Sequence, residues 1–169
     1  MAALEICKVG DPVLRKKAVP IKRISKNIRR LIKEMAEAMY AADGVGLAAP
    51  QVGVSKRLVV LDVGEGLLVL INPVITHQEG EVLMVEGCLS VPETAGKVIR
   101  AAKVTMEALD ENGRKIWITG EGLLARALQH ELDHLEGQLY TDIAEEVFES
   151  EPEDEDDPRD EQDHKIDTE

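Results

Sequence analysis

Residues 121–137 carry the sequence EGLLARALQHELDHLEG, which predicts the C-terminal helix around which the fold is organised. Good helix formers fill most of the stretch, and the glycine at its end is a residue that commonly terminates a helix. At about 100° per residue, His130, Glu131 and His134 share one face of that helix. Polar side chains cluster on the other arc, which predicts that the histidines point into the protein: Arg126, Gln129, Asp133 and Glu136.

The pattern H-E-x-x-H at residues 130–134 is typical of a metal-dependent hydrolase. Two imidazoles one helical turn apart can bind the same ion, and a carboxylate beside them can reach the water that the ion polarises. The same letters also occur on helices whose histidines are hydrogen-bonded core residues and whose glutamate is paired. The helix alone leaves both interpretations open.

A hydrolytic metal site needs a third protein ligand and an open position for water. A metzincin-like pattern would have a histidine where this sequence has Tyr140. The glutamates farther along lie in a strongly acidic segment, and His77 and His164 are more simply explained as solvated residues. Cys88 remains, because a thiolate is a strong ligand for divalent transition metals. The alternative for an isolated cysteine is a small buried apolar residue, which is our interpretation of Cys7.

Apolar residues at spacings of three and four follow a possible capping residue, Ser25, and predict a long amphipathic helix: Ile28, Leu31, Ile32, Met35 and Met39. The helix should end at Asp43-Gly44-Val45-Gly46. Two glycines separated by one residue permit backbone geometry that other residues resist, so this stretch is interpreted as a functional turn.

Short runs of branched apolar residues, bounded by glycine or proline, predict three strands, at residues 56–63, 67–71 and 82–85. Asn112-Gly113 predicts a tight or bulged hairpin, with strands at residues 104–109 and 115–119. Strands between an early helix and a late helix indicate an α+β fold. We expect short antiparallel or mixed sheets packed around the C-terminal metal-binding helix.

The chain has 169 residues and a formal charge of −13, which is concentrated at its end. Residues 144–169 include 14 Asp or Glu against Arg159 and Lys165, so residues 1–143 carry only −1. The final segment has too little apolar surface to offset the entropy of ordering. We expect a single catalytic domain over residues 1–148 and an acidic, disordered tail over residues 149–169.

Composition also excludes several classes of protein. With 44% hydrophobic and 31% charged residues, the chain is typical of a soluble globular protein and not of a fibrous or membrane-anchored one. Its start lacks the features of a secretory signal, and no window has the length of a membrane span. Two cysteines are too few for a disulfide scaffold and fit a reducing compartment. We expect a cytoplasmic protein with no membrane partner, and the polyanionic tail argues against direct binding to nucleic acid.

Three stretches together resemble the signature motifs of peptide deformylases, in the same order and at similar spacing. They are GVGLAAPQ at residues 44–51, EGCLS at residues 86–90 and QHELDHLEG at residues 129–137. The resemblance covers roughly residues 1–145. It implies a metal-dependent hydrolase that removes the formyl group from the N-terminal formylmethionine of nascent polypeptides and releases formate.

Transferred by motif position, the resemblance implies three ligands for one divalent metal ion: Cys88, His130 and His134. Water on that ion attacks the formyl carbonyl, and Glu131 serves as general base and then as general acid. Gln51 and the backbone N–H of Leu89 stabilise the resulting oxyanion. The family favours iron(II), Fe²⁺, although one cysteine and two histidines also accept Zn²⁺, Ni²⁺ or Co²⁺.

The resemblance also implies a substrate channel along the glycine-rich stretch, lined by Gly44, Val45 and Gly46. Gly46 would bind the peptide backbone and Val45 would contact the methionine side chain. Helix geometry adds Leu123 and Ala127, which lie on the metal-facing side one and two turns before His130. These residues predict a pocket for an unbranched apolar side chain.

The sequence departs from the family in two places. Many relatives have a larger or basic residue near position 95, where this chain has the small stretch Thr94-Ala95-Gly96. Some relatives dock on the ribosome through a basic C-terminal extension, and an acidic tail cannot do so by attraction to phosphate.

Two other functions remain open. The first is a metallopeptidase that cuts internal peptide bonds, although no histidine or glutamate is an evident third ligand for it. The second is a non-catalytic metal-binding relative, which the presence of Glu131 and Gln51 disfavours.

Overall fold

The computed structural model describes residues 4–150, so residues 151–169 of the predicted acidic tail, His164 among them, lie outside the described residues. The helices are the 3-10 helix η1 (Pro12–Arg15), α1 (Lys26–Ala41), the 3-10 helix η2 (Ala49–Val52), α2 (Gly122–Leu135) and α3 (Tyr140–Ile143). The strands are β1 (Gly46–Ala48), β2 (Leu58–Leu61), β3 (Leu68–Glu79), β4 (Val82–Cys88), β5 (Val91–Arg100), β6 (Lys103–Leu109), β7 (Lys115–Glu121) and β8 (Glu146–Glu149).

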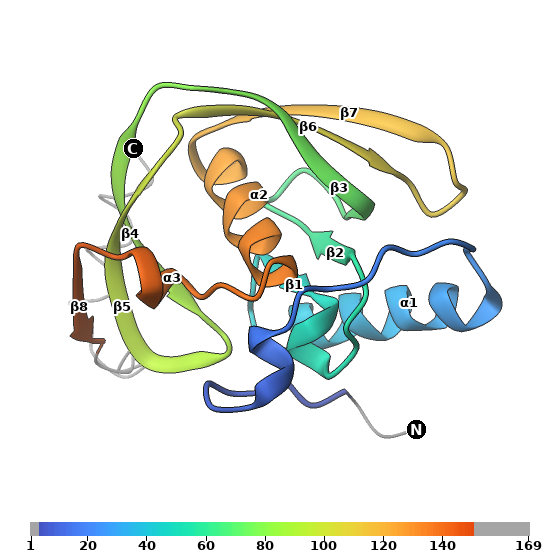
Figure 1. Cartoon of the computed structure of the whole chain (residues 1–169), viewed down its shortest axis with the longest axis horizontal. Coiled ribbons are helices and arrows are strands. Elements are labelled where there is room, and N and C mark those ends of the chain that lie inside the picture. Colours follow the sequence, from blue (N-terminus) through green and yellow to red (C-terminus); the bar gives the residue numbers. More distant parts are fainter. Residues whose placement is uncertain (1–3, 151–169) are drawn as a thin grey trace.

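Five strands form an antiparallel sheet in the order β1-β2-β3-β6-β7 (Figure 1). This sheet contributes residues to two separate clusters of core side chains. Successive side chains of a strand point to opposite faces, so the wholly buried strand β2 contributes to both layers. Val59 and Leu61 pack in the layer that contains residues of α2, whereas Leu58 and Val60 pack in the layer that contains residues of α1. The two helices therefore cover opposite faces of this sheet.

A second antiparallel sheet, in the order β4-β5-β8, forms the other side of the molecule (Figure 1). Its small core is made by Val91 and Val98 of β5 with Leu139 and Tyr140, the residues that follow α2. The α+β class and the antiparallel sheets agree with the prediction. This sheet brings the end of β4 to the side of α2 that carries the histidines.

The helix predicted after Ser25 is α1. The Oγ of Ser25 accepts a hydrogen bond from the backbone N–H of Ile28 at 3.2 Å, which is the contact of an N-terminal cap. Met35 and Met39 on its apolar face are fully buried. The predicted hairpin is formed by β6 and β7, with Gly113 at φ 80 and the Asp110 side chain accepting from the N–H groups of Asn112 and Arg114.

Several strands differ from their predicted bounds. The strand predicted at residues 67–71 is the first part of β3, which continues to Glu79. The second half was not predicted because it is polar. It lies at the surface and pairs with β6, past two register shifts. β5 was not predicted, because its sequence VPETAGKVIR mixes proline, glycine and charge. The described structure also continues through β8 to Ser150, past the predicted domain boundary at residue 148.

The prediction for the glycine-rich stretch was wrong in its physical reason. Gly44 and Gly46 do not adopt positive φ, and Asp43 does, at φ 54. Gly46 begins the buried strand β1 instead of a turn. Space limits both positions, most strictly position 46, where an added Cβ would lie 2.8 Å from Oε1 and 2.9 Å from Cγ of Glu131. At position 44 it would meet only the end of the Leu89 side chain, at 2.8 Å.

Among residues 4–150, none of the helices combines the length and the apolar character that crossing a bilayer requires.

Candidate metal centre

Helix α2 presents three polar side chains to the protein interior. His130, Glu131 and His134 are all buried, as the helical spacing predicts. The helix ends at Leu135, and Gly137, just beyond the capping residue Glu136, has a left-handed φ of 77; an added Cβ there would lie 2.6 Å from the carbonyl oxygen of Arg15. The far end of the helix is thus held closely against the N-terminal segment, which fixes the position of the histidines.

Cys88 reaches the two histidines from the last residue of β4. Its Sγ lies 3.4 Å from Nε2 of His134, and one donor atom from each of Cys88, His130 and His134 lies within 4.8 Å of the others. Metal–sulfur bonds of about 2.3 Å and metal–nitrogen bonds of about 2.0–2.1 Å in a tetrahedron place such donors about 3.5 Å apart. The three donors are close enough to share one ion.

A buried ion-pair network fixes the orientation of His130. Nδ1 of His130 lies 2.8 Å from Oε1 of Glu86, which leaves Nε2 facing Cys88 and His134. Arg100 donates two hydrogen bonds to Glu86, at 2.8 and 2.9 Å, and a third to Asp133 at 2.5 Å. A carboxylate behind a ligating histidine sets its tautomer and ring position. Glu86 and Arg100 therefore support the site without entering it.

Burial and ion pairing set the charge of two members of this cluster, Glu86 and His134. Burial by itself raises the pKa of Glu86, but hydrogen bonds from Arg100 and His130 lower it to about 2, so Glu86 is ionised. Burial, together with the charge of His130, lowers the pKa of His134 to about 3. Its imidazole is therefore neutral and has a free electron pair to offer to a metal ion.

Two buried polar atoms in this cluster have no hydrogen-bond partner among the described residues. They are Oε2 of Glu131 and Nδ1 of His134. Burial raises the pKa of Glu131 to about 7, because its charged form is taken out of water. An unpaired buried polar group is costly, and a bound ion with its water is a common explanation for one. The donor set and the orphaned Oε2 of Glu131 fit a single metal ion with its water.

Gln51 lies beside the cluster with its amide orientation fixed. Its Oε1 accepts a hydrogen bond from the N–H of Ala48 at 2.9 Å, so its Nε2 points the other way. Nε2 donates to Oγ of Ser90 at 3.1 Å and lies 3.7 Å from Sγ of Cys88. An N–H donor is thus directed at the same space as the three possible metal ligands.

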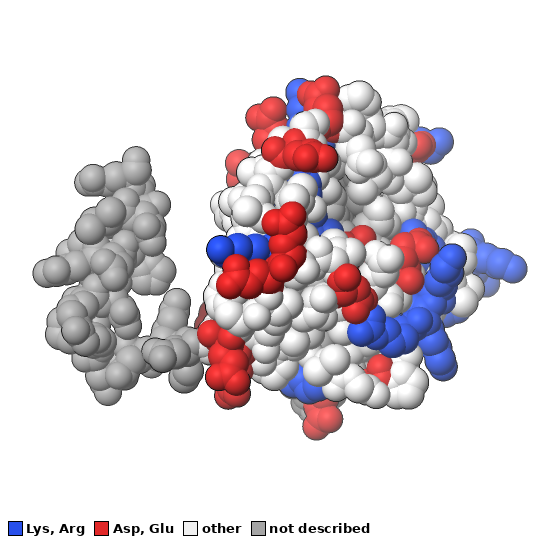
Figure 2. Space-filling model, turned by 60° about the vertical axis from the view of Figure 1, so that its left-hand side comes forward, with Lys and Arg blue, Asp and Glu red and all other residues white. Residues whose placement is uncertain are grey.

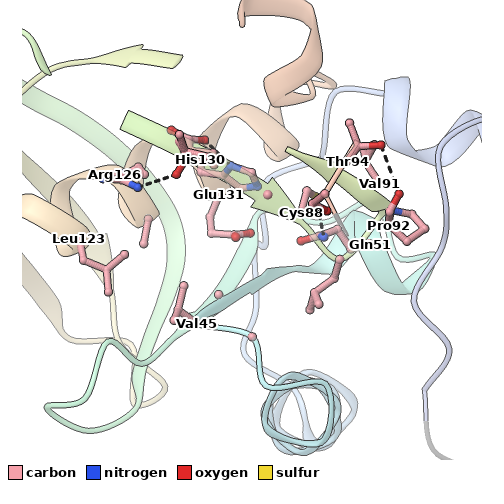
Figure 3. Close-up of a pocket in the computed structure, with 18 of the residues that line it drawn as sticks. Val45, Gln51, Cys88, Val91, Pro92, Thr94, Leu123, Arg126, His130 and Glu131 are labelled. Carbon is pink, nitrogen blue, oxygen red and sulfur yellow. Dashed lines mark hydrogen bonds and ion pairs between the residues drawn. The ribbon is translucent and has the colours of Figure 1, made fainter. Parts of the chain in front are cut away.

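The cluster opens into a cavity of about 450 Å³. Its lining includes all eleven residues that the sequence assigned to the site except His134, which is fully buried. Figure 3 shows Val45 and Leu123 on one side of Cys88 and His130, and Pro92 and Thr94 on the other. Leu123 and Val45 expose 47% and 41% of their surface, so apolar area is available there to a ligand.

Sequence reasoning missed several residues around the site. The polar arc of α2 is not a solvated face, because Gln129 is buried on the backbone of Ala101, Asp133 pairs with Arg100, and Arg126 lines the cavity. The partner of His130, Glu86, begins the motif EGCLS, which gives no indication of this role. The residues around Glu86 do not indicate its pairing with Arg100, because that pairing depends on the β4–β5 hairpin and β5 was not predicted.

Replacing Gly46 with alanine should lower kcat/KM of the hydrolysis that the sequence predicts by about 10²-fold. The new Cβ would lie 2.8 Å from Oε1 and 2.9 Å from Cγ of Glu131, and it would therefore displace the carboxylate of Glu131. Gly87→Ala is the matched control, since its Cβ would meet only the carbonyl oxygen of Thr94, at an ordinary 3.7 Å. Steady-state kinetics of the two variants should therefore differ strongly. Equal kinetics for Gly46→Ala and the unmodified chain would show that Glu131 has room to move.

Comparison with known proteins gives one consistent family. The sequence model of the family described as polypeptide deformylase matches residues 3–148. A peptide deformylase of Desulfitobacterium hafniense is 60% identical over 144 residues, which cover 85% of this chain and 96% of that protein. One of Halothermothrix orenii is 58% identical over 144 residues, covering 84% of this chain and 94% of that protein.

Solved structures agree. The chain is similar to the crystal structure of a peptide deformylase from Thermotoga maritima, with a TM-score of 0.84 and 41% identity over 86% of this chain and all of that one. It is also similar to a peptide deformylase from Synechococcus elongatus in complex with actinonin, with a TM-score of 0.82 and 45% identity over 85% of this chain and 79% of that one.

Proposed function

Because the chain belongs to the polypeptide deformylase family, we propose how its own residues carry out the reaction of that family. The protein is a metal-dependent hydrolase that removes the formyl group from the N-terminus of nascent polypeptides. Its metal ligands are Cys88, His130 and His134. The observation that carries this assignment is that the three donor atoms lie within 4.8 Å of one another, beside a buried carboxylate.

The ion is proposed to be iron(II), on the resemblance to the family. A thiolate with two imidazoles also accepts Zn²⁺, Ni²⁺ or Co²⁺, and availability in the cell then decides. When bound, the ion supplies a Lewis acid that makes water a nucleophile near neutral pH.

Glu131 moves the proton in this reaction. Glu131 lines the cavity and its Oε2 has no hydrogen-bond partner among the described residues, so its carboxylate is the proposed acceptor of a proton from the water that attacks the formyl carbon. The same carboxyl group then gives that proton to the amine nitrogen as the carbon–nitrogen bond breaks. Formate and a free methionine amino group are the products, and Glu131 returns to its ionised form.

Gln51 and Leu89 stabilise the negative charge that develops on the formyl oxygen. The Nε2 of Gln51 is directed at the cluster because its Oε1 is held by the N–H of Ala48. Leu89 follows Cys88 in the turn after β4, and its carbonyl accepts from Nζ of Lys8 at 3.0 Å. That contact holds the peptide unit between Leu89 and Ser90, and the Leu89 N–H, in the preceding peptide unit, is proposed as the second donor.

Replacing Gln51 with methionine, which has a similar size but no N–H, should lower kcat by about 10²–10³-fold with a small effect on KM. The reason is that the donor interacts with charge that exists only in the transition state. Kinetics on a formyl-Met peptide, with metal analysis of each preparation, checks this. A normal kcat with a normal metal content would remove Gln51 from the mechanism.

The methionine side chain is proposed to lie against Val45, Leu123 and Ala127, which line the cavity with apolar surface. Gly44 and Gly46 line the same cavity without a side chain, so a peptide backbone can approach β1 closely there. An unbranched apolar side chain next to a peptide backbone fits an N-formylmethionyl polypeptide.

Release of formate from formyl-Met-Ala-Ser, with the peptide bonds left intact, is the direct test. Mass spectrometry of the products separates the alternatives. A metallopeptidase would cleave between residues, and a non-catalytic relative would leave the substrate unchanged. Elemental analysis of protein purified without oxygen identifies the ion in the same preparation.

The catalytic domain is proposed to comprise residues 1–148, which agrees with the family match to residues 3–148. Residues 149–169 are proposed as an acidic extension outside it. We place the protein in the cytoplasm, where nascent polypeptides are made. Docking on ribosomal phosphate through the acidic extension is not expected, because like charges repel.

A further inference from the structure

Strand β7 lies at the edge of the five-stranded sheet. It pairs with β6 along its whole length, from Lys115 opposite Leu109 to Glu121 opposite Lys103, without a register shift. Among residues 4–150, no strand pairs with its other side, and no backbone hydrogen bond outside the regular elements involves it. Figure 1 shows β7 at the top of the molecule. An edge strand without a proline or a bulge is a template for pairing with another strand.

The hairpin turn determines which backbone groups of β7 are unpaired. The N–H of Asp110 donates to the carbonyl oxygen of Arg114 at 2.8 Å. Hydrogen-bonded and non-hydrogen-bonded pairs alternate along an antiparallel ladder, so Ile116 and Ile118 bond to β6. The C=O of Glu121 accepts in the first turn of α2, because this residue is the N-cap. The groups that point away from β6 are therefore the N–H and C=O of Lys115, Trp117 and Thr119 and the N–H of Glu121.

The same alternation places the side chains of these residues on the face of the sheet away from α2. On that face, Oγ1 of Thr119 lies 2.9 Å from Oγ1 of Thr105, and Nζ of Lys115 lies 2.9 Å from Oε1 of Glu107. Helix α1 packs on this side of the sheet mainly against β1 and β2. Trp117 is therefore 63% exposed, more than any other large apolar side chain among residues 4–150.

The sequence of β7, KIWITGE, is complementary to itself in charge. In an antiparallel pair of two such strands with Ile118 at the centre, Lys115 lies opposite the partner's Glu121, and Glu121 lies opposite the partner's Lys115. All of these residues direct free backbone groups toward the partner. The hydrogen-bond ladder and the two ion pairs therefore agree in one register.

The neighbouring registers that keep the ladder fit less well. With Trp117 at the centre, Lys115 would lie opposite Thr119, and Glu121 would lie opposite Gly113 in the hairpin turn. With Thr119 at the centre, Glu121 would lie opposite Trp117, and Lys115 would lie opposite Leu123, which is already in α2. Neither register pairs the two charges.

We propose that two copies of this chain associate through β7, with the strands antiparallel and Ile118 at the twofold axis. The two five-stranded sheets then form one continuous sheet. Trp117 lies opposite the partner's Thr119 and diagonal to the partner's Trp117, at about 7–8 Å, which aromatic side chains can span. A contact of this symmetry uses the same surface on both copies, so assembly stops at the dimer.

The size and the charge of the contact set its strength. Each copy contributes one strand of seven residues, which is a small interface. The chain has a formal charge of −13, and Figure 2 shows Asp and Glu side chains over much of the left half of one face. Two copies therefore repel at a distance, although about 0.15 M salt confines that repulsion to about 8 Å. We expect a dissociation constant of about 10–100 µM.

The test is sedimentation equilibrium of the metal-loaded full chain, from about 1 to about 500 µM at about 0.15 M salt. Tryptophan emission is recorded over the same range, because Trp117 is the only tryptophan of the chain and reports on the contact alone. Three variants are compared with the parent chain: Lys115→Glu, Glu121→Lys and, as the matched control, Lys33→Glu. The control reverses an exposed charge on α1, away from β7. Circular dichroism checks the fold of each.

The mass of the parent chain should rise from monomer to dimer with concentration, and its tryptophan emission should shift to shorter wavelength in parallel. Each charge reversal on β7 should weaken association by about tenfold or more, because like charges then face each other at both ends of the ladder. The Lys33→Glu chain should associate as the parent does. An equimolar mixture of the Lys115→Glu and Glu121→Lys chains should recover the parent affinity, because both ion pairs form again between unlike chains.

A parent chain that stays monomeric up to about 500 µM would overturn the proposal. So would β7 variants that associate as strongly as the parent, since the contact would then lie elsewhere. A mixture that associates no better than the separate variants would exclude the register. The proposal does not depend on the proposed function, because neither Lys115 nor Trp117 lines the cavity.

Discussion

Replacing Glu131 with glutamine should lower kcat by about 10²–10⁴-fold while the protein keeps its metal, because glutamine fills the same space and cannot accept or deliver a proton. Glu131 is not among the three clustered donors, so all three proposed protein ligands of the ion remain in this variant. The Oε2 of Glu131 has no hydrogen-bond partner, so no second side chain within residues 4–150 is hydrogen-bonded to this oxygen.

The measurement is formate release alongside elemental analysis of the same samples. Glu136→Gln is the matched control, since it changes a carboxylate on the end of the same helix that is exposed and pairs with Arg57. Its turnover should be normal. If Glu131→Gln retained full activity with bound metal, the proton transfer would have to be assigned to another group.

Replacing Cys88 with alanine should remove both the metal and the activity. Two imidazoles without the thiolate form a weak site, because a stable site of this type uses three protein ligands. We expect metal content to fall below about a tenth of an equivalent after dialysis, and turnover to fall with it. Cys88 lies at the end of a strand and is only half-buried, so the fold should persist.

Cys7→Ala is the control for this experiment, because Cys7 is the other free cysteine, is also half-buried and lies outside the three-residue cluster. It should bind metal and turn over normally. Circular dichroism and thermal unfolding of both variants check that the fold is intact. A Cys88→Ala protein that kept a full equivalent of tightly bound metal would show that the third ligand is another residue.

The sequence predicted those parts of the site that depend on local periodicity. The spacing of His130, Glu131 and His134 on a helix brings them to one face regardless of the rest of the chain, and the structure places them there. Cys88 was found by elimination and by its motif. Its approach to His134 depends on the pairing of β4 and β5, which brings the strand end toward α2.

Other features depend on contacts between segments far apart in sequence. Arg100 binds both Glu86 and Asp133, which lie on different elements, and a single arginine in a mixed strand gives no sign of such a role. The small size required at Gly46 comes from Glu131, which is 85 residues away. The glycine was noticed for the freedom of its backbone, whereas the structure uses its lack of a side chain.

The short strand β8 has a consequence for how the protein behaves in concentrated solution. Without it, the outer edge of β5 would present unpaired backbone N–H and C=O groups, which are a template for pairing with a strand of another molecule. β8 occupies that edge, and it is a strand of four residues that includes the exposed Glu146 and Glu149. Repulsion between such edges works against sheet-to-sheet association, so residues 146–149 protect the enzyme from aggregation.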